Sequence, residues 1–340
     1  MKRHINIPIF IPHLGCPNTC VFCNQRTISG VEEFKAEDTI PEIERALETV
    51  DKDAECEIAF FGGSFTGIDR ALMIRLLEIG HSYIKKGLVK SLRLSTRPDY
   101  ISEEILDILK SFGVGTIELG LQSASDAVLD KCKRGHSFED EKRAAHLITK
   151  YGFDFVGQMM IGLPGATLED EIKTAKFIIS SGATGARIYP TVVFYGTELC
   201  DMAISGEYKP LSNEEAAMRS ARVYERFFEA GVKVIRIGLQ ASENLSNPDK
   251  FYAGASHSAM GELVLGEFYF ERIKKALLGL GGALTEQINI YVPSGAVSCA
   301  VGQNKRNKLR LTEEFSLKSI KFKEDCDLSF GEVKVGLQER

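Results

Sequence analysis

Residues 91–121 read SLRLSTRPDYISEEILDILKSFGVGTIELGL, and this stretch decides the fold. It starts with a short alternating apolar run, Ser91–Ser95, that is typical of a strand. Ser102–Phe112 then places apolar side chains on one side of a helix after a capping serine, and Val114–Leu121 is a second apolar run. A strand, an amphipathic helix and another strand in succession predict two parallel strands joined by a helical crossover.

The same alternation extends in both directions along the chain. It predicts further strands at Ile5–Ile11, Cys56–Phe61, Phe155–Ile161, Gly185–Pro190 and Val232–Ile237. It predicts further helices at Pro41–Val50, Asp69–Lys85, Asp126–Lys131, Phe138–Tyr151, Leu168–Ser180, Ser212–Glu229 and Ser258–Leu278. This order indicates an α/β protein, either doubly wound or curled into a partial or full (β/α) barrel, and chemistry is expected where its strands end.

Composition places the chain among ordinary globular proteins, with 340 residues, 44% of them hydrophobic and 26% charged. No apolar run approaches the roughly 18 residues of a membrane-spanning helix. The basic start, Met1–Arg3, is followed by an apolar stretch that Pro8 and Pro12 interrupt, without a signal-peptide cleavage site. We therefore expect a cytoplasmic protein that makes no membrane contact.

Three of the eight cysteines, Cys16, Cys20 and Cys23, form a C-x3-C-x2-C motif directly after the first predicted strand. Three thiolates on one loop can hold three corners of an iron–sulfur cluster and leave the fourth iron open. The alternatives are a zinc loop completed by His13 or a distant cysteine, or three unrelated thiols. The other five cysteines are interpreted as core or surface thiols, because this chain is too sparse in cysteine for a disulfide framework.

Polar and glycine-rich segments follow four more predicted strands. Each alone is more often a turn or a cap, but their shared position at strand ends predicts a single binding site. The candidate residues are Gly62, Gly63, Ser64, Ser95, Thr96, Arg97, Glu118, Gln122, Gly162 and Leu163.

The cysteine motif, with Phe22 before its last cysteine, resembles that of the radical S-adenosylmethionine (SAM) enzymes. The resemblance implies a [4Fe-4S] cluster on the three cysteines and SAM chelated by the open iron. In that family, reduction of the cluster cleaves SAM to methionine and a 5′-deoxyadenosyl radical that abstracts hydrogen from the substrate. It further implies that the ten strand-end residues contact SAM, that Arg134 lies near the SAM carboxylate, and that a ferredoxin or flavodoxin supplies electrons.

Several longer strings resemble the radical-SAM half of the Elongator catalytic subunit, which modifies tRNA wobble uridines. They are Ser95–Tyr100, Glu118–Ser123, Lys133–His136, Arg187–Thr191, Gly196–Leu199 and Gly206–Pro210. The resemblance covers about residues 1–240 and implies an RNA substrate; nothing after Gln240 resembles the acetyl-CoA-binding domain of Elongator. Two alternatives stay open: a porphyrin-type substrate, as in oxygen-independent coproporphyrinogen oxidases, and a cluster-bearing module without turnover.

The C-terminal segment predicts a second, small α/β unit at 285–340 after a barrel domain at 1–284. We expect a strand at Gln287–Val292, a helix at Lys305–Phe315 and a strand at Ser319–Lys323. The chain carries a net charge of −5, yet residues 303–323 hold seven Lys or Arg against two Glu. Residues 297–309 loosely resemble the clamp loop and helix of a KH domain, which implies RNA contacts by Lys305, Arg306, Lys308 and Arg310. A solvated basic helix on a capping domain is the alternative.

Overall fold

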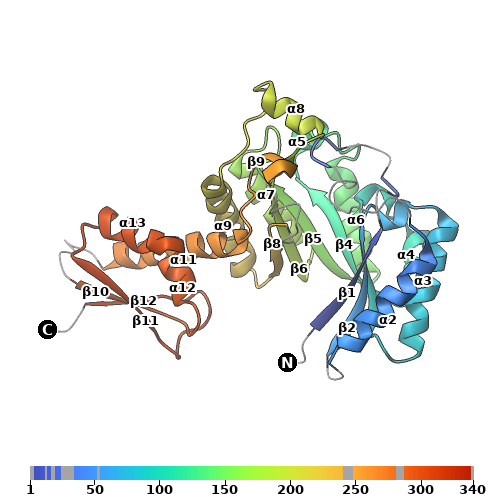
Figure 1. Cartoon of the computed structure of the whole chain (residues 1–340), viewed down its shortest axis with the longest axis horizontal. Helices are drawn as coiled ribbons and strands as arrows, with labels where there is room; N and C mark the ends of the chain where they lie inside the picture. Colours follow the sequence, from blue (N-terminus) through green and yellow to red (C-terminus); the bar gives the residue numbers. More distant parts are fainter. Residues whose placement is uncertain are drawn as a thin grey trace.

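The computed structural model describes residues 4–11, 14–16, 20–23, 34–51, 54–239, 248–280 and 287–337. Its main feature is a seven-stranded sheet in the order β1-β2-β3-β4-β5-β6-β8 in which every neighbouring pair is parallel. The strands are β1 (His4–Ile11), β2 (Glu55–Gly62), β3 (Ser91–Thr96), β4 (Val114–Gln122), β5 (Asp154–Ile161), β6 (Gly185–Pro190) and β8 (Lys233–Ile237). Among the described strands β1 and β8 do not pair, so the curled sheet is a partial barrel (Figure 1).

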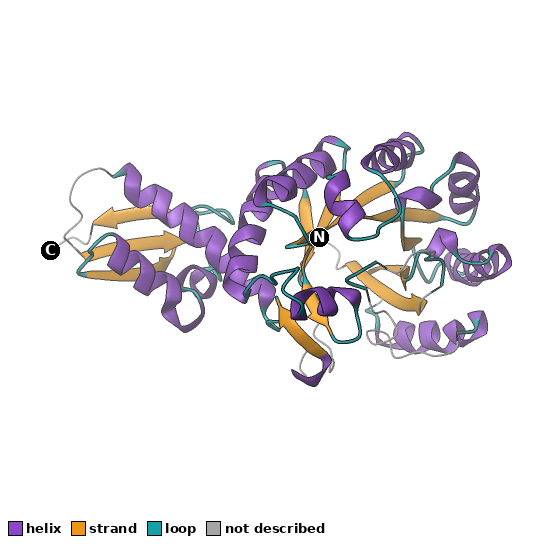
Figure 2. Cartoon of the chain, turned by 90° about the horizontal axis from the view of Figure 1, so that it is seen from above, coloured by secondary structure: helices purple, strands orange, loops and turns teal. Residues whose placement is uncertain are grey.

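Helices cover the outer face of this sheet (Figure 2). They are α2 (Thr39–Thr49), α3 (Arg70–Lys85), α4 (Glu103–Ser111), α6 (Phe138–Lys150), α7 (Leu168–Ser180) and α9 (Asn213–Glu229). The short helices α5 (Asp126–Lys131) and α8 (Glu198–Ile204) lie instead beyond the carboxyl ends of the strands, where they pack in a separate cluster with Val21 (Figure 1). Ser137, Thr167 and Ser212 begin α6, α7 and α9 with complete capping boxes. The predicted strands and helices are confirmed, and each begins and ends within two residues of its predicted bounds.

The main core lies between the sheet and these helices. Alternate residues of β1, namely Ile7, Ile9 and Ile11, point into it and are almost fully buried, whereas Phe10 is exposed on the other face. This period of two fixes which side chains line the inner face of the partial barrel.

Five short helices and strands were not predicted from the sequence. They are β7 (Val192–Phe194) and β9 (Phe251–Gly254), which pair antiparallel, together with α8, α12 (Val297–Val301) and β12 (Lys334–Leu337). None exceeds seven residues.

A second, smaller sheet with the order β11-β10-β12 forms the C-terminal part. Its strands β10 (Gln287–Val292) and β11 (Ser319–Glu324) are parallel, and α13 (Arg306–Glu314) follows α12 between them. The long helix α11 (Met260–Gly279) packs in one core with this sheet and with Ala217 of α9. The proposed boundary between 284 and 285 lies outside the described residues, so the two domains stay a prediction.

Within the described ranges, no helix combines the length and the apolarity needed to cross a membrane.

Candidate functional site

The cysteine loop follows β1 and is anchored to two other parts of the chain. The Cys23 amide donates to the Cys20 carbonyl at 2.9 Å, which forms a turn between these two cysteines. The Val21 amide donates to the Cys132 carbonyl at 3.2 Å, and the Val21 carbonyl accepts from the Leu199 amide of α8 at 2.8 Å. These backbone bonds place the middle cysteine against the segment between α5 and α6. His13 lies outside the described residues.

The three thiols of the loop are not gathered tightly around one point. Among the described residues, the sulfurs of Cys16, Cys20 and Cys23 do not all lie within 4.8 Å of one another. Burial raises the pKa of the Cys132 thiol to about 12, which keeps this nearby cysteine protonated.

The glycine pair at the end of β2 is required by the cysteine loop itself. A Cβ on Gly63 would lie 2.0 Å from the Leu14 carbonyl oxygen, and one on Gly62, whose φ is +115°, would lie 2.3 Å from the Ile11 oxygen. The Ser64 amide donates to the Leu14 carbonyl at 3.2 Å. Only glycine allows β2 to approach the segment that leads to Cys16 this closely. We therefore predict that a larger residue at Gly63 would displace the cysteine loop.

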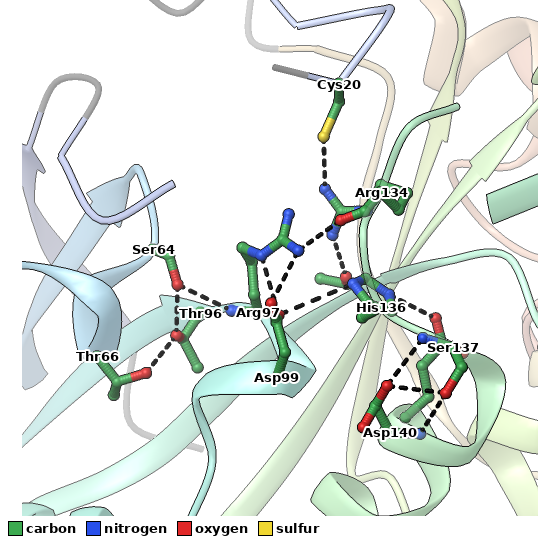
Figure 3. Close-up of polar contacts among 12 residues, drawn as sticks. Cys20, Ser64, Thr66, Thr96, Arg97, Asp99, Arg134, His136, Ser137 and Asp140 are labelled. Atoms are coloured by element: carbon green, nitrogen blue, oxygen red, sulfur yellow. Dashed lines mark hydrogen bonds and ion pairs between the residues drawn. The ribbon is translucent and has the colours of Figure 1, made fainter. Parts of the chain in front are cut away.

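Three hydroxyl groups join the ends of β2 and β3. Ser64 Oγ lies 2.9 Å from Thr96 Oγ1, and Thr66 Oγ1 lies 2.6 Å from the same atom (Figure 3). Ser64 Oγ also accepts the Arg97 amide at 3.2 Å, and Ser95 lines a small hollow together with Gly63 and Ser64. The hydroxyls of Ser64 and Thr96 are thus hydrogen-bonded to each other, and this bond positions the ends of the two strands.

Two buried arginines lie beside the cysteine loop (Figure 3). Arg134 Nη1 donates to Cys20 Sγ at 3.2 Å, and Nη2 donates to the Gly120 carbonyl at 2.7 Å. Arg97 makes a bidentate pair with Asp99, with both distances 2.9 Å, and also donates to the Arg134 carbonyl. The structure therefore directs the Arg134 guanidinium toward a cysteine sulfur, a contact that the sequence did not indicate.

A buried histidine and carboxylate lie next to these arginines. His136 Nε2 is 3.1 Å from Glu141 Oε1, and His136 Nδ1 is 3.9 Å from Asp99. Burial, then the charges of Arg134 and Arg97, lower the pKa of His136 to about 3, and burial raises the pKa of Glu141. Both shifts favour the neutral forms, so the positive charge beside the cysteines comes from the arginines.

Glu118 is fully buried on the inner face and is held by three side chains. Arg187 donates to its two oxygens at 2.6 and 2.8 Å, Arg93 donates at 3.1 Å and Gln158 at 2.8 Å. Burial alone would raise the pKa of Glu118, but the hydrogen bonds and charges of these partners outweigh it and hold the pKa below its usual value. Both oxygens accept hydrogen bonds from these side chains, which fixes the position of the carboxylate on the inner face.

Gln122 ends β4 in a left-handed conformation with a φ of +73°. This conformation is uncommon outside glycine and marks a strained position. Its buried Oε1 has no hydrogen-bond partner among the described residues, nor do Arg97 Nη1 and Arg134 Nε. These three atoms offer unused hydrogen-bonding capacity around the ends of β3 and β4.

The segment at the end of β5 is held by residues that sequence reasoning missed. The Gly162 amide donates to Glu171 Oε1 at 2.7 Å, and its carbonyl accepts from the Tyr208 hydroxyl at 2.6 Å. Arg219 donates to both oxygens of Glu171, at 2.6 and 2.8 Å. Leu163 is 2% exposed and packs in a cluster with Val21 and Tyr208. Glu171 lies on the buried face of α7. A charged residue among the apolar positions of this predicted helix was the sequence feature that could have identified it.

Comparison with known proteins agrees with this arrangement. The model of the Radical SAM superfamily matches residues 10–178, and that of the Radical_SAM C-terminal domain matches residues 183–269. An uncharacterized protein of Methanocaldococcus jannaschii, MJ0486, is 32% identical over 227 residues, which cover 63% of this chain and 69% of that protein. The chain belongs to the radical SAM superfamily. It is therefore an enzyme, and its cofactors are a [4Fe-4S] cluster and SAM.

Other relatives of this radical SAM chain carry names linked to tRNA. The tRNA uridine(34) acetyltransferase of Methanocaldococcus infernus is 39% identical over 129 residues, 37% of this chain and 24% of that protein. Human Elongator complex protein 3 is 29% identical over 204 residues, 54% of this chain and 37% of that protein. The chain thus matches less than half of the length of either relative.

A solved structure shares the fold. The archaeal Elp3 of Methanocaldococcus infernus, with an N-terminal deletion, superposes with a TM-score of 0.63 at 24% identity. The match covers 84% of this chain and 66% of that chain.

The residues of the radical SAM site fit the two cofactors. The donor set is three thiols on one loop, which suits a cluster with one open iron. The buried unpaired atoms of Arg97, Gln122 and Arg134 lie near the same loop and strand ends, where a polar cofactor could satisfy them.

The four candidate RNA-binding cations are placed unequally. Arg310 Nη1 donates to Glu267 Oε1 at 2.6 Å, and its guanidinium lies 3.7 Å from the centre of the Phe270 ring. Arg306 lies 3.8 Å from Glu214 and 4.0 Å from Glu267. Lys305 is exposed and has a left-handed φ of +61°. Arg310 is thus engaged in packing α13 against α11, whereas Lys305 and Lys308 have no ion pair among the described residues.

Proposed function

We propose that this radical SAM enzyme cleaves SAM reductively and uses the resulting 5′-deoxyadenosyl radical to modify an RNA substrate similar to tRNA. The observation that supports an RNA substrate is that two of the Elongator-like strings contact each other in the folded chain. Arg187, in the string Arg187–Thr191, forms its bidentate pair with Glu118, in the string Glu118–Ser123, although 69 residues separate them. The strings thus form one arrangement on the inner face, beside Tyr189.

We assign Cys16, Cys20 and Cys23 as the cluster ligands. The cluster, when bound, supplies the electron that cleaves SAM, and a ferredoxin or flavodoxin supplies that electron in turn. The chain supplies the surroundings. Gly62 and Gly63 admit the cysteine loop against β2, and the groups that we assign to SAM are Arg97, Gln122 and the Gly162–Leu163 segment. Glu171 and Tyr208 position that last segment through its backbone.

The test is anaerobic reconstitution with iron and sulfide, followed by dithionite and SAM, with unmodified tRNA present or absent. We expect 5′-deoxyadenosine release to rise when tRNA is added, and a mass change in the nucleosides of the digested tRNA. A Cys20→Ala variant is the control and should release none. If 5′-deoxyadenosine release rises with coproporphyrinogen instead of tRNA, the result would favour a porphyrin substrate. SAM binding without cleavage under any condition would contradict the proposal.

We further propose that the C-terminal unit contributes RNA contacts through Lys305 and Lys308. Replacing both by Ala should lower the salt slope of binding to single-stranded RNA by about 1.4 units, at about 0.7 per phosphate. Replacing all four predicted cations would add the structural effect of losing the Arg310–Glu267 pair. The matched control removes Lys142 and Lys150 from α6, and an equal change in slope there would assign the effect to net charge alone.

A further inference from the structure

The contact between Arg134 and Cys20 places a fixed positive charge on one sulfur of the cysteine loop. The donor–sulfur distance is 3.2 Å, and the two residues are 6% and 5% exposed. A charge-assisted hydrogen bond in so dry a position is stronger than one at the surface. The positive charge of Arg134 therefore acts on the sulfur with little screening by solvent.

The surrounding chain holds Arg134 in this place. Lys133 and Gly135, on either side of it, have left-handed φ angles of +53° and +72°, and the Arg134 amide donates to the Leu129 carbonyl at 3.0 Å. Two residues before Arg134, the Cys132 carbonyl accepts the amide of Val21, which is adjacent to Cys20. The arginine and the cysteine are thus parts of two loops that are bonded to each other.

The other charged groups nearby do not duplicate this contact. Arg97 is engaged with Asp99, and the His136–Glu141 pair favours its neutral forms. Arg134 differs from them in donating directly to Cys20 Sγ.

We propose that Arg134 is a positioning residue that sets the reduction potential of the cluster. The proposal rests on the assignment of Cys20 as a cluster ligand and not on the RNA substrate. One electron from a low-potential donor adds negative charge that the ligand sulfurs share, and no bond forms or breaks. Because the guanidinium favours that added charge, Arg134 raises the potential, in the way that hydrogen bonds to ligand sulfurs tune iron–sulfur clusters.

The test is a redox titration of the reconstituted full chain, without RNA, followed by electron paramagnetic resonance of the reduced cluster. Arg134→Gln keeps a donor and loses the charge, Arg134→Met loses both, and Arg134→Lys keeps the charge. We expect the ratio of reduced to oxidised cluster at a fixed potential to fall at least tenfold in Arg134→Met, which is a shift of about 59 mV for one electron. The reduction potential of Arg134→Gln should lie between those of Arg134→Met and the wild type, and that of Arg134→Lys should be closest to the wild type.

The matched control is Lys133→Asn, which removes a positive charge one residue away on the same loop. Lys133 is exposed and paired with Glu198, and asparagine tolerates its left-handed conformation, so the potential should stay unchanged. Iron content and SAM affinity are measured on every variant. An unchanged potential in Arg134→Gln and Arg134→Met would overturn the proposal. Loss of iron from all three Arg134 variants would overturn it in favour of a purely structural role, and a tenfold loss of SAM affinity at unchanged potential would assign Arg134 to the SAM carboxylate instead.

Discussion

Glu118→Gln tests whether the buried ion network on the inner face holds the partial barrel together. The carboxylate accepts four hydrogen bonds: two from Arg187, one from Arg93 and one from Gln158. A glutamine has the same shape, but its NH₂ group would face two of these donors, so at most two of the four bonds survive. The substitution also leaves the buried Arg187 without its carboxylate.

The expected cost follows from the burial of these groups. Removing one partner of a buried ion pair costs about 3–5 kcal/mol, because the remaining charge stays desolvated. The matched control is Glu104→Gln, which breaks the Arg70–Glu104 pair at 3.1 Å, where the side chains are 48% and 73% exposed. Exposed pairs contribute about 0–1 kcal/mol. The two variants thus make the same chemical change at opposite extremes of burial.

The assay is urea unfolding of the chain followed by far-ultraviolet circular dichroism, at pH 7 and at several acidic values. The pKa of Glu118 is lower in the folded chain than its usual value of 4.5, so its contribution is complete above that value. The contribution is lost as the pH falls from there through the folded pKa. The difference between wild type and Glu118→Gln should shrink over this acidic range. A loss at pH 7 no larger than that of Glu104→Gln would refute the reasoning.

Three further outcomes are expected. Replacing Cys16, Cys20 or Cys23 by Ala should lose the iron measured after reconstitution, and replacing Cys56 or Cys132 should leave it; the reverse pattern would disprove the ligand assignment. Gly63→Val should lower iron content together with SAM binding, because its side chain would collide with the Leu14 carbonyl, and normal iron would show that the cysteine loop can shift freely. Tyr208→Phe should cost about 1 kcal/mol of stability and lower SAM affinity in calorimetry, since the Gly162 carbonyl loses its 2.6 Å partner. Tyr252→Phe, in β9 with a side chain that is 43% exposed, should change neither.

The sequence by itself determined the parallel α/β fold and the cysteine motif. Long strands and amphipathic helices repeat their apolar residues at fixed periods, so local patterning identifies them without tertiary information. The cysteine motif lies within eight residues, and its chemistry can be read from its spacing. The strand-end positions of Ser64, Arg97 and Gln122 follow from the same periodicity.

The tertiary structure alone decided which groups meet. Arg134 contacts Cys20 across 114 residues, Arg187 contacts Glu118 across 69, and Arg310 contacts Glu267 across 43. No local pattern carries such pairings, because the partner of a charged side chain depends on how the strands and loops pack. For the same reason, the ion pairs of Glu118 and Arg310 could not be predicted from the sequence.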